Sequence, residues 1–568
     1  MKIALAQQNY HIGNFEDNSL KIIEAIKRAK KAGADLVVFS ELCVCGYAPR
    51  DFLEFEDFIN KASQAVDRIK EHADSIGVLI GCPVPNHQRE GKDLFNAVLF
   101  LHDRQIKGEV HKTLLPNYDV FDEYRYFEPA FEWNVIEYMG KKLAITICED
   151  IWNMGDNPLY RVTPMEKLMP FQPDVMINLS ASPYNYAQDV VRNSIVKAHT
   201  LKYKLPMLYC NAVGSQTEIV FDGGSLVYDI NGRKVKELKY FEEDEAIFDL
   251  EELSKKLPVD EKAHAEPVYF SALDVGAGVN TLDYLADEKN IDEIYHALIL
   301  GIRDYFQKMG FSKAILGASG GIDSAVTQAL AVKALGREQV RAILMPSPYS
   351  SSHSVSDAEL LSKKLCNPYD IIPIKSIYES FLDTLKPVFK DLPFGLAEEN
   401  IQARTRGNLL MAIANKFGYI LLNTSNKSEL ATGYGTLYGD MAGGLSVLGD
   451  TYKTQVYALA RYINKKEEII PSQIISKPPS AELRPGQKDS DSLPEYDTLD
   501  RILYEYIEMR NGPKEIVEKG YDAALVARVL KLVNTNEYKR NQFCPIIRVS
   551  CKAFGTGRRV PIVGKYLS

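Results

Sequence analysis

The chain has 568 residues, more than one hydrophobic core organises, so we expect two or three domains. Its composition is typical of a globular protein, with 46% hydrophobic and 25% charged residues. The 67 basic and 76 acidic side chains leave a net charge of −9, which argues against nucleic acid as a partner.

The sequence carries no targeting or disulfide signal. Residues 1–8 (MKIALAQQ) lack the apolar core of a signal peptide, and no apolar run reaches the length of a membrane span. The motif Cys-x-x-Cys does not occur, so the sequence indicates neither a zinc site nor the disulfide framework of a secreted protein. We therefore expect a cytoplasmic protein with reduced thiols and no membrane partner. The eight cysteines are Cys43, Cys45, Cys82, Cys148, Cys210, Cys366, Cys544 and Cys551.

The first half alternates short apolar runs with helical patterns, which predicts a sheet packed against helices. A helix is predicted from about Asp17 to Ala32, and its buried face would carry every third residue from position 20 to position 29. These four residues are Leu20, Ile23, Ile26 and Ala29. The predicted strands are Ile3–Ala6, Leu36–Phe39, Val78–Ile80, Ala97–Leu101, Leu143–Ile147, Val175–Leu179 and Met207–Cys210.

The pattern loosens after residue 250. Residues 255–265 are charged and include Pro258, and we place a linker at residues 251–285. The prediction is a first domain over residues 1–250 and a second over residues 286–568.

The second half has an α/β pattern of its own. A helix beginning near Asn290 carries an apolar stripe, and a polar stretch at residues 477–496 contains four prolines. Such a stretch is typical of a loop, and we expect it to cover a site. The stripe consists of Ile294, Leu298, Ile302 and Phe306, and the predicted strands are Ala314–Leu316, Ala342–Met345 and Tyr419–Leu422.

Three residues of the first half would form an acyl-transfer site if the fold brought them together. Cys148 ends a predicted strand, Glu41 follows another, and Lys112 lies between them in the sequence. A nearby cation lowers the pKa of a thiol. Glu41 would act as general base and then acid, and Lys112 would stabilise an oxyanion. Singly, each has an ordinary explanation as a buried thiol, a surface carboxylate or a solvated lysine.

Residues 1–250 resemble the nitrilase, or carbon–nitrogen hydrolase, family. The phrases that carry the resemblance are FSELCVCGY (39–47), HKTLLPNYDVFDE (111–123) and TICEDIW (146–152). The resemblance implies an α-β-β-α sandwich and a catalytic triad of Glu41, Lys112 and Cys148. It also implies that Glu123 supports Lys112.

The same resemblance implies a glutamine pocket lined by Tyr118, Trp152 and Ser182. Relatives that use glutamine often place a basic residue six positions after this serine, where this chain has Gln188. Which group meets the glutamine carboxylate therefore stays open, with Gln188 and Arg192 as candidates.

Residues 317–324 (GASGGIDS) form a glycine-rich turn between a predicted strand and a helix, where backbone N–H groups surround phosphate oxygens. No Gly-Lys-Ser/Thr closes it, so it is not the ATPase loop that grips the β- and γ-phosphates. Ser319, Asp323 and Ser324 instead suit a departing pyrophosphate and its Mg²⁺. The turn resembles the SGGxDS signature of the ATP-pyrophosphatase family. This implies a Rossmann-like parallel sheet of the adenine nucleotide alpha hydrolase type.

Further motifs select a group within that family. They are NTSNKSELATGY (423–434), TLYGD (436–440), KTQVY (453–457), KPPSAEL (477–483) and FGTGRR (554–559). With the first half, they make nearly the whole chain resemble the glutamine-dependent NAD synthetases. That family uses glutamine and ATP to amidate nicotinic acid adenine dinucleotide (deamido-NAD) through an acyl-adenylate, releasing AMP and pyrophosphate.

The resemblance also implies roles for single residues. The ATP contacts would be Gly317, Ala318, Ser319, Gly320, Gly321, Ile322, Asp323, Ser324 and Thr424. The deamido-NAD contacts would be Asn400, Glu429, Lys453 and Lys539, and the Mg²⁺ ligands Asp323 and Glu429. A solvated surface charge is an equally ordinary explanation for either lysine. No Gly-x-Gly-x-x-Gly occurs, so NAD is expected as a product and not as a redox cofactor.

Other functions stay open from sequence alone. One is another amidating synthetase with the same adenylation chemistry, and another is a nucleotide-binding regulator without activity. A nucleic-acid thiolating enzyme would need a basic surface to bind its substrate, and the acidic composition of the chain does not indicate one. We also expect a sheltered passage for neutral ammonia from Cys148 to Ser319, and a homo-oligomer, because members of the resembling family are homo-oligomers.

Overall fold

The computed structural model describes residues 1–88, 90–154, 158–257 and 269–567. It contains two compact units, Met1–Val275 and Gly276–Ser568, and their division falls inside the predicted linker. Residues 258–268 of that linker lie outside the described residues. None of the helices described is both long and apolar enough to cross a bilayer.

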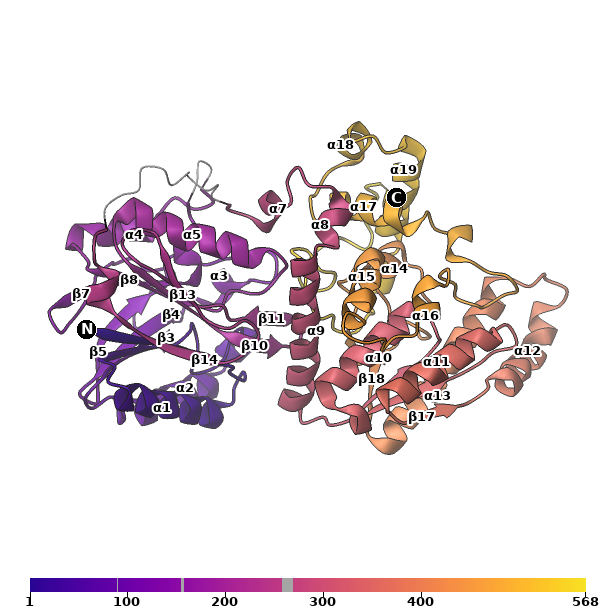
Figure 1. Ribbon diagram of the computed structural model, residues 1–568, viewed down its shortest axis with the longest axis horizontal. Coiled ribbons are helices and arrows are strands. Elements are labelled where there is room, and N and C mark those ends of the chain that lie inside the picture. Colours follow the sequence, from indigo (N-terminus) through magenta and orange to yellow (C-terminus); the bar gives the residue numbers. More distant parts are fainter. Residues whose placement is uncertain (89, 155–157, 258–268, 568) are drawn as a thin grey trace. The chain divides into compact units, whose positions relative to one another are not determined.

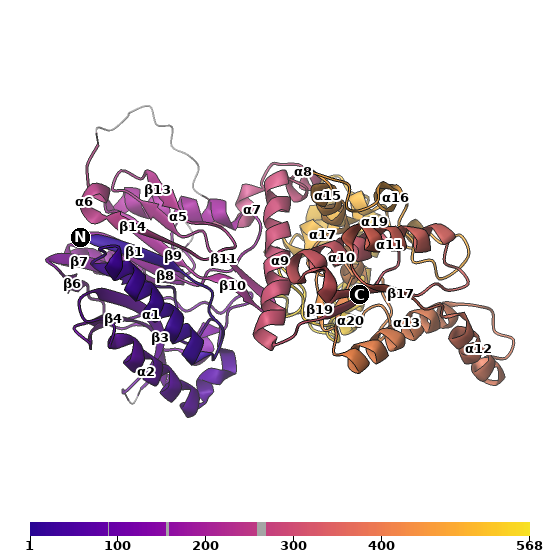
Figure 2. The same ribbon diagram turned by 60° about the horizontal axis from the view of Figure 1, so that its bottom comes forward.

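The first unit stacks two six-stranded sheets between helices (Figures 1 and 2). Helices α1 (Phe15–Lys31) and α2 (Glu56–Lys70) cover the first sheet, and α5 (Gln188–Tyr203) covers the second (Figure 1). This confirms the predicted α-β-β-α sandwich.

Neighbouring strands in each sheet are not always consecutive in the chain. In spatial order the first sheet runs β14 (Asp244–Asp249), β1 (Lys2–Gln7), β2 (Leu36–Val38), β3 (Gly77–Pro85), β4 (Leu94–His102), β5 (Gln105–His111). The second runs β13 (Lys234–Glu237), β12 (Leu226–Tyr228), β9 (Met207–Asn211), β8 (Val175–Ser180), β7 (Lys141–Ile147), β6 (Ile136–Tyr138). The unit also contains a hairpin of β10 (Val213–Gln216) and β11 (Ile219–Asp222) and the short helices α3 (Glu123–Tyr126), α4 (Pro164–Leu168), α6 (Leu250–Leu253) and α7 (Ala272–Val275).

Alternating side chains build two layers of core around the first sheet. Ile3 and Leu5 of β1 pack between the sheets, whereas Ala4 and Ala6 pack toward α1 and α2. A strand sends successive side chains to opposite faces, so apolar residues at every position mean that both faces are covered. The strands predicted for this half are present, with ends shifted by a few residues.

The helix prediction was wrong about one residue. Leu20 is 52% exposed, whereas Ile22, Ile26 and Ala29 form the buried face of α1. A strict spacing of three residues advances about 300° per step, so three steps turn the stripe by about half a circle. Leu20 and Ala29 therefore lie on opposite sides of the helix.

The second unit contains a five-stranded, all-parallel sheet in the order β17-β16-β15-β18-β19. Helix α11 (Ser352–Leu365) packs on one face of this sheet and α13 (Leu396–Phe417) on the other (Figure 2). This confirms the predicted Rossmann-like parallel sheet. The strands are β15 (Ala314–Gly317), β16 (Val340–Leu344), β17 (Tyr369–Ile371), β18 (Ile420–Asn423) and β19 (Leu445–Ser446).

The predicted helix near Asn290 is α9 (Glu288–Met309), and all four residues of its predicted stripe are buried. The polar stretch at residues 477–496 is irregular apart from the turn Asp489–Asp491 and the first residue of α17. The remaining helices are α8 (Thr281–Leu285), α10 (Ile322–Leu335), α12 (Lys375–Phe389), α14 (Lys427–Thr432), α15 (Lys453–Ile463), α16 (Ser472–Ser476), α17 (Tyr496–Ile507), α18 (Pro513–Glu518), α19 (Ala523–Thr535) and α20 (Glu537–Arg540).

Gly81 of β3 has no side chain, which allows the turn after β2 to pack closely against β3. A Cβ atom built on Gly81 of β3 would collide with the backbone nitrogen of Leu42 and lie 2.8 Å from the carbonyl carbon of Glu41. Val44 N also donates to Gly81 O at 3.2 Å. Glycine at this strand position therefore allows the backbone of Glu41 to lie close to β3.

We expect Gly81→Ala to lower the stability of the protein by about 1–3 kcal/mol, because the new methyl group has only backbone to displace. The matched control is Gly108→Ala in β5, where the nearest atoms would lie at an ordinary 3.5 Å. Differential scanning calorimetry of both variants measures the effect. Equal melting of Gly81→Ala and Gly108→Ala would contradict the close approach.

Candidate active sites

A buried lysine lies between two carboxylates in the first unit. Lys112 Nζ donates to Glu41 Oε1 at 2.7 Å and to both oxygens of Glu123 at 2.8 Å. Tyr47 OH donates to Glu123 Oε1 at 2.7 Å. All three charged side chains are shielded from solvent, so two carboxylates around one ammonium leave an excess negative charge in the interior.

Two strands of the first sheet and a short helix bring these groups together. Glu41 follows β2, Lys112 follows β5, and Glu123 begins the short helix α3 (Glu123–Tyr126). Burial alone would lower the pKa of Lys112, but Glu123 and Glu41 outweigh it and raise that pKa well above its ordinary value. The lysine is therefore a permanent cation.

Cys148 directly follows β7 and begins the turn η2 (Cys148–Ile151), with a φ of +40°. Burial raises the pKa of its thiol, Glu41 raises it further, and Lys112 only partly opposes them. The sequence had suggested that a nearby cation lowers this pKa, and the direction is the opposite because desolvation dominates. Cys148 therefore rests as a thiol and needs a base to become a nucleophile.

Asp150 fixes the turn that carries Cys148. Its carboxylate accepts hydrogen bonds from Thr113 N (3.0 Å), Leu114 N (2.8 Å) and Ile147 N (2.9 Å). One side chain thus joins the chain after Lys112 to the chain before Cys148. Burial raises the pKa of Asp150 to about 7, so holding the ionised form has an energetic cost.

Glu149 is a second buried carboxylate next to the thiol. Tyr118 OH donates to both of its oxygens (2.9 and 3.0 Å), and Tyr160 OH donates to Oε1 at 3.1 Å. Burial raises the pKa of Glu149 to about 7. Sequence motifs alone assigned it no role, although it directly follows Cys148 in TICEDIW.

The remaining residues predicted for a glutamine pocket lie on several elements. Trp152 follows the Cys148 turn, and Ser182 follows Ala181, whose backbone N–H donates to Glu41 Oε2 at 3.1 Å. Gln188 begins α5 and accepts a hydrogen bond from Asn185 at 3.2 Å.

Arg192 was the alternative partner for the glutamine carboxylate. It is fully buried and donates to both oxygens of Asp222, at 3.1 and 2.8 Å. Its charge is already neutralised by a protein carboxylate, so its surroundings do not favour that role.

The glycine-rich turn of the second unit lines a cavity of about 270 Å³. All eight residues 317–324 reach its wall, together with Thr424 and residues 477–483. Gly320 has a φ of +79°, and a Cβ atom there would collide with the carbonyl oxygen of Ser354 in α11. Only glycine therefore lets the turn pack against this helix.

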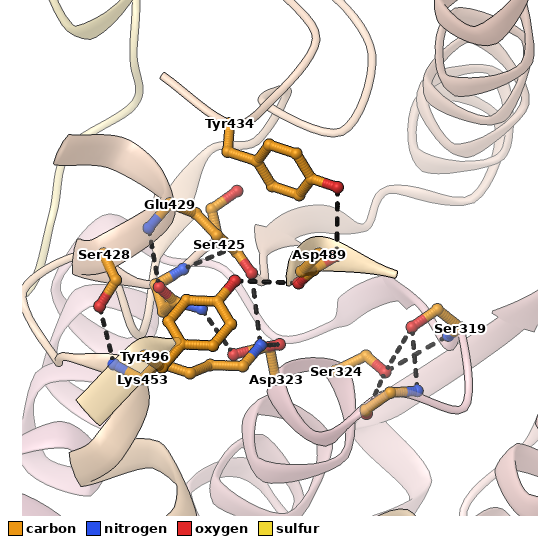
Figure 3. A network of polar contacts seen from close by, with 12 residues as sticks. Ser319, Asp323, Ser324, Ser425, Ser428, Glu429, Tyr434, Lys453, Asp489 and Tyr496 are labelled. Atoms are coloured by element: carbon orange, nitrogen blue, oxygen red, sulfur yellow. Dashed lines mark hydrogen bonds and ion pairs between the residues drawn. The ribbon is translucent and has the colours of Figure 1, made fainter. Parts of the chain in front are cut away.

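Hydroxyl groups hold the turn in shape. Ser324 Oγ lies 3.1 Å from Ser319 Oγ and donates to Gly321 O at 3.0 Å (Figure 3). Gly321 N donates to Ser319 Oγ at 3.2 Å. The N-terminus of α10 begins one residue later and faces the cavity, an arrangement that favours anions.

Carboxylates surround a buried lysine in this cavity as well (Figure 3). Lys453 Nζ lies 2.6 Å from Asp323 Oδ2 and 3.4 Å from Glu429 Oε1. Asp489 is also in the wall and accepts hydrogen bonds from Tyr434 OH (3.1 Å) and Tyr496 OH (2.9 Å). Burial and the charge of Asp323 raise the pKa of Glu429.

The NTSNKSELATGY segment positions this cluster. Asn426 caps α14 and donates to Asp323 Oδ1 at 2.8 Å, and Ser428 Oγ accepts from Lys453 N at 2.9 Å. Lys427, the residue between them, is fully buried and is paired with Asp450 and Glu508. Adjacent residues of one motif thus have different positions: Asn426 and Ser428 hold residues that line the cavity, whereas Lys427 is paired within the core.

The proline-containing segment is tied to α11. Glu482 accepts hydrogen bonds from Ser351 Oγ (2.9 Å), Ser354 Oγ (2.7 Å) and Lys477 Nζ (3.0 Å). Residues 477–483 therefore form a wall of the cavity, fixed to the same helix start that the glycine-rich turn contacts.

Two predicted contacts are not among the described residues that line the cavity. Asn400 Oδ1 accepts from Thr436 Oγ1 at 2.8 Å, and Lys539 Nζ donates to the carbonyls of Gly433 and Gly435 at 2.7 and 2.8 Å. Lys539 therefore shapes the turn after α14.

Comparison with known proteins agrees with this arrangement. The carbon–nitrogen hydrolase family matches residues 2–255 and the NAD synthase family matches residues 294–543. The glutamine-dependent NAD(+) synthetase of Synechocystis sp. is 44% identical over 99% of this chain and 98% of its own length. That of Thermotoga maritima is 41% identical over 100% of this chain and 99% of its own length.

A solved structure is similar along its whole length. The glutamine-dependent NAD+ synthetase of Acinetobacter baumannii, in complex with ADP, has a TM-score of 0.74 and 38% identity, covering 100% of this chain and 99% of that one. Identity at this level over the full length shows the family. The chain belongs to the family of glutamine-dependent NAD(+) synthetases.

Proposed function

We propose that this chain hydrolyses glutamine at Cys148 and uses the ammonia to convert deamido-NAD to NAD at the cavity beside residues 317–324. The observation that carries the proposal is the presence, in one chain, of the buried Glu41–Lys112–Cys148 group and a phosphate-type turn with a carboxylate-flanked lysine. Full-length similarity to synthetases of this kind supports the pairing.

In the first reaction Glu41 takes the proton of Cys148, and the thiolate attacks the side-chain carbonyl carbon of glutamine. Lys112 stabilises the oxyanion, and Glu41 returns the proton to the departing ammonia. Water then hydrolyses the thioester to glutamate. Because the thiol is the resting form, the base is essential and not merely helpful.

Glu149 is suited to the α-ammonium group of glutamine. It is a buried carboxylate whose hydrogen-bond donors are two tyrosine hydroxyls, so a substrate cation would complete its surroundings. Tyr118, Trp152, Ser182 and Gln188 stay predicted neighbours of the substrate.

In the second reaction the glycine-rich turn and the N-terminus of α10 hold the phosphates of ATP. The nicotinate carboxylate attacks the α-phosphate, pyrophosphate leaves, and ammonia displaces AMP from the acyl-adenylate. Lys453 stabilises the charge that develops on the phosphate oxygens. Thr424 lines the cavity as an ATP contact, and Asn400, Glu429 and Lys539 stay predicted contacts of deamido-NAD.

The donor set of the cavity fits a magnesium ion. The cavity wall carries three carboxylates, Asp323, Glu429 and Asp489, but among the described residues they face only one ammonium group, that of Lys453. The protein therefore offers more oxygen ligands and more negative charge than Lys453 can neutralise. We propose Asp323 and Glu429 as its ligands, with phosphate oxygens supplying others. A Mg²⁺ ion held there would neutralise phosphate charge. Within the described residues no set of three or more His, Cys, Asp or Glu side chains forms a metal site without substrate.

The prediction of a homo-oligomer has support from α12. Tyr378 is its only buried residue, and the apolar side chains of Phe381, Val388, Leu392 and Leu396 are exposed on it and on the segment that follows. Such a surface is typical of contact with another chain, here a second copy. Cytoplasmic location, the absence of nucleic-acid partners and a passage for ammonia stay predictions.

We expect Cys148→Ala to lose NAD formation from glutamine and to keep NAD formation from ammonium, since only the first reaction needs the thiolate. Rates with the two nitrogen donors measure this. Cys366→Ala removes an exposed thiol and should keep both activities. Efficient use of glutamine by Cys148→Ala would refute the nucleophile.

Asp323→Ala should abolish pyrophosphate release with either nitrogen donor, because it removes the carboxylate beside Lys453 and an oxygen ligand. Chelation of Mg²⁺ should stop pyrophosphate release in the unchanged protein, and added Mg²⁺ should restore it. Asp370→Ala removes a half-exposed carboxylate paired with Arg341 and is the control. A fully active Asp323→Ala protein would overturn this site.

The Michaelis constant for glutamine should rise as the pH falls below about 7. Burial raises the pKa of Glu149 to about 7, so the carboxylate that holds the ammonium is ionised above this pH and neutral below it. The rise should approach ~10-fold per pH unit. Glu149→Gln should have a high, pH-independent constant, whereas Glu166→Gln, an exposed carboxylate, should behave as the unchanged protein. A flat pH profile of the unchanged protein would contradict the assignment.

A further inference from the structure

Asn96 of β4 forms hydrogen bonds with both carboxylates around Lys112 and with the backbone of Lys112. Its Nδ2 donates to Glu41 Oε1 at 2.7 Å and to Glu123 Oε2 at 3.2 Å. Its backbone carbonyl accepts from Lys112 N at 2.8 Å. The side chain is fully buried, and neither the sequence motifs nor the proposed mechanism gives it a role.

The hydrogen bonds of Glu41 distinguish its two carboxylate oxygens. Oε1 accepts from Lys112 Nζ and from Asn96 Nδ2, both at 2.7 Å. Among the described residues, Oε2 accepts only from Ala181 N at 3.1 Å. A carboxylate oxygen has two lone pairs, so Oε1 is saturated and Oε2 keeps one open position.

The orientation of the Asn96 amide follows from the same contacts. Turning it over would place Oδ1 against oxygens of Glu41 and Glu123, where only a donor is favourable. In the observed orientation Oδ1 is buried and has no hydrogen-bond partner among the described residues. A buried unpartnered acceptor is unfavourable for stability, so its retention indicates a task for the donor side of the amide.

We propose that Asn96 is a positioning residue for glutamine hydrolysis, which saturates Glu41 Oε1 together with Lys112 and so directs proton transfer to Glu41 Oε2. In that step the S–H bond of Cys148 breaks, an O–H bond forms at Oε2, and the sulfur electron pair forms the C–S bond to glutamine. The C–N bond later breaks, and the proton on Oε2 leaves with ammonia. The inference rests on the proposed function of Cys148 and Glu41.

Asn96→Leu removes the donor at nearly constant volume and tests the proposal in the full-length chain. We expect kcat with glutamine to fall by about 10- to 100-fold, which is the usual effect of losing one hydrogen bond to a charged group. The KM for glutamine and the ammonium-driven rate should stay within about twofold, because neither substrate binding nor the second site involves Asn96.

The pH profile separates positioning from a structural role. Without the amide donor the ionised carboxylate of Glu41 is less favoured, so the acid limb of kcat at saturating glutamine should move to higher pH in Asn96→Leu. The pH dependence of KM, which we assign to Glu149, should stay the same. If the rate of Asn96→Leu is lower at every pH but the pH midpoint of its acid limb is unchanged, the proposal is overturned. Asn96→Asp, isosteric and without a donor, should lose more kcat than Asn96→Leu because it adds a third carboxylate. The opposite order would also overturn it.

Two further variants complete the design. Asn178→Leu removes another fully buried strand asparagine, whose amide donates to the hydroxyl of Thr146, and should leave kcat and the pH profile unchanged. An equal loss in Asn178→Leu would assign the effect to packing. Glutamine use by Cys148→Ala would refute the proposed function itself. If Cys148→Ala loses NAD formation from glutamine but Asn96→Leu keeps it in full, only the role of Asn96 is refuted.

Discussion

A single buried ammonium group among more carboxylates than it can neutralise is the constraint on which both sites depend. Lys112 faces Glu41 and Glu123, and Lys453 faces Asp323 and Glu429. Isolated buried charges are very costly, so each lysine must be held by a dense set of hydrogen bonds. The surplus negative charge favours the species that we propose for each site, a proton in the first and a metal ion with phosphate in the second.

The two sites support their lysines by different means. In the first unit, the ends of β2 and β5, two strands of one sheet, the start of α3 and the close approach at Gly81 bring the charged groups together. In the second unit, the start of the short helix α14 supplies a cap, a core lysine and a carboxylate from four positions of the chain, residues 426–429. A sheet edge thus gathers residues that are distant in the sequence, whereas a helix start gathers residues that are adjacent.

The sequence predicted what periodicity and local motifs encode. Buried strands such as Val175–Leu179 stand out because every residue but one is apolar, and residues 317–324 because glycine and hydroxyl positions are local. It missed what depends on tertiary contacts. Asn96 and Asp150 form hydrogen bonds with chain segments that are far away in the sequence. The prediction that Leu20 is buried was wrong because spacing alone does not determine which side of a helix is buried.

Ser354 connects two walls of the cavity beside residues 317–324. Its carbonyl oxygen stands against Gly320, and its hydroxyl bonds Glu482, so two walls share one residue at the start of α11. Because packed helices move as rigid segments, a small rotation of α11 would displace both walls together. The positions of these two walls are therefore not independent of each other.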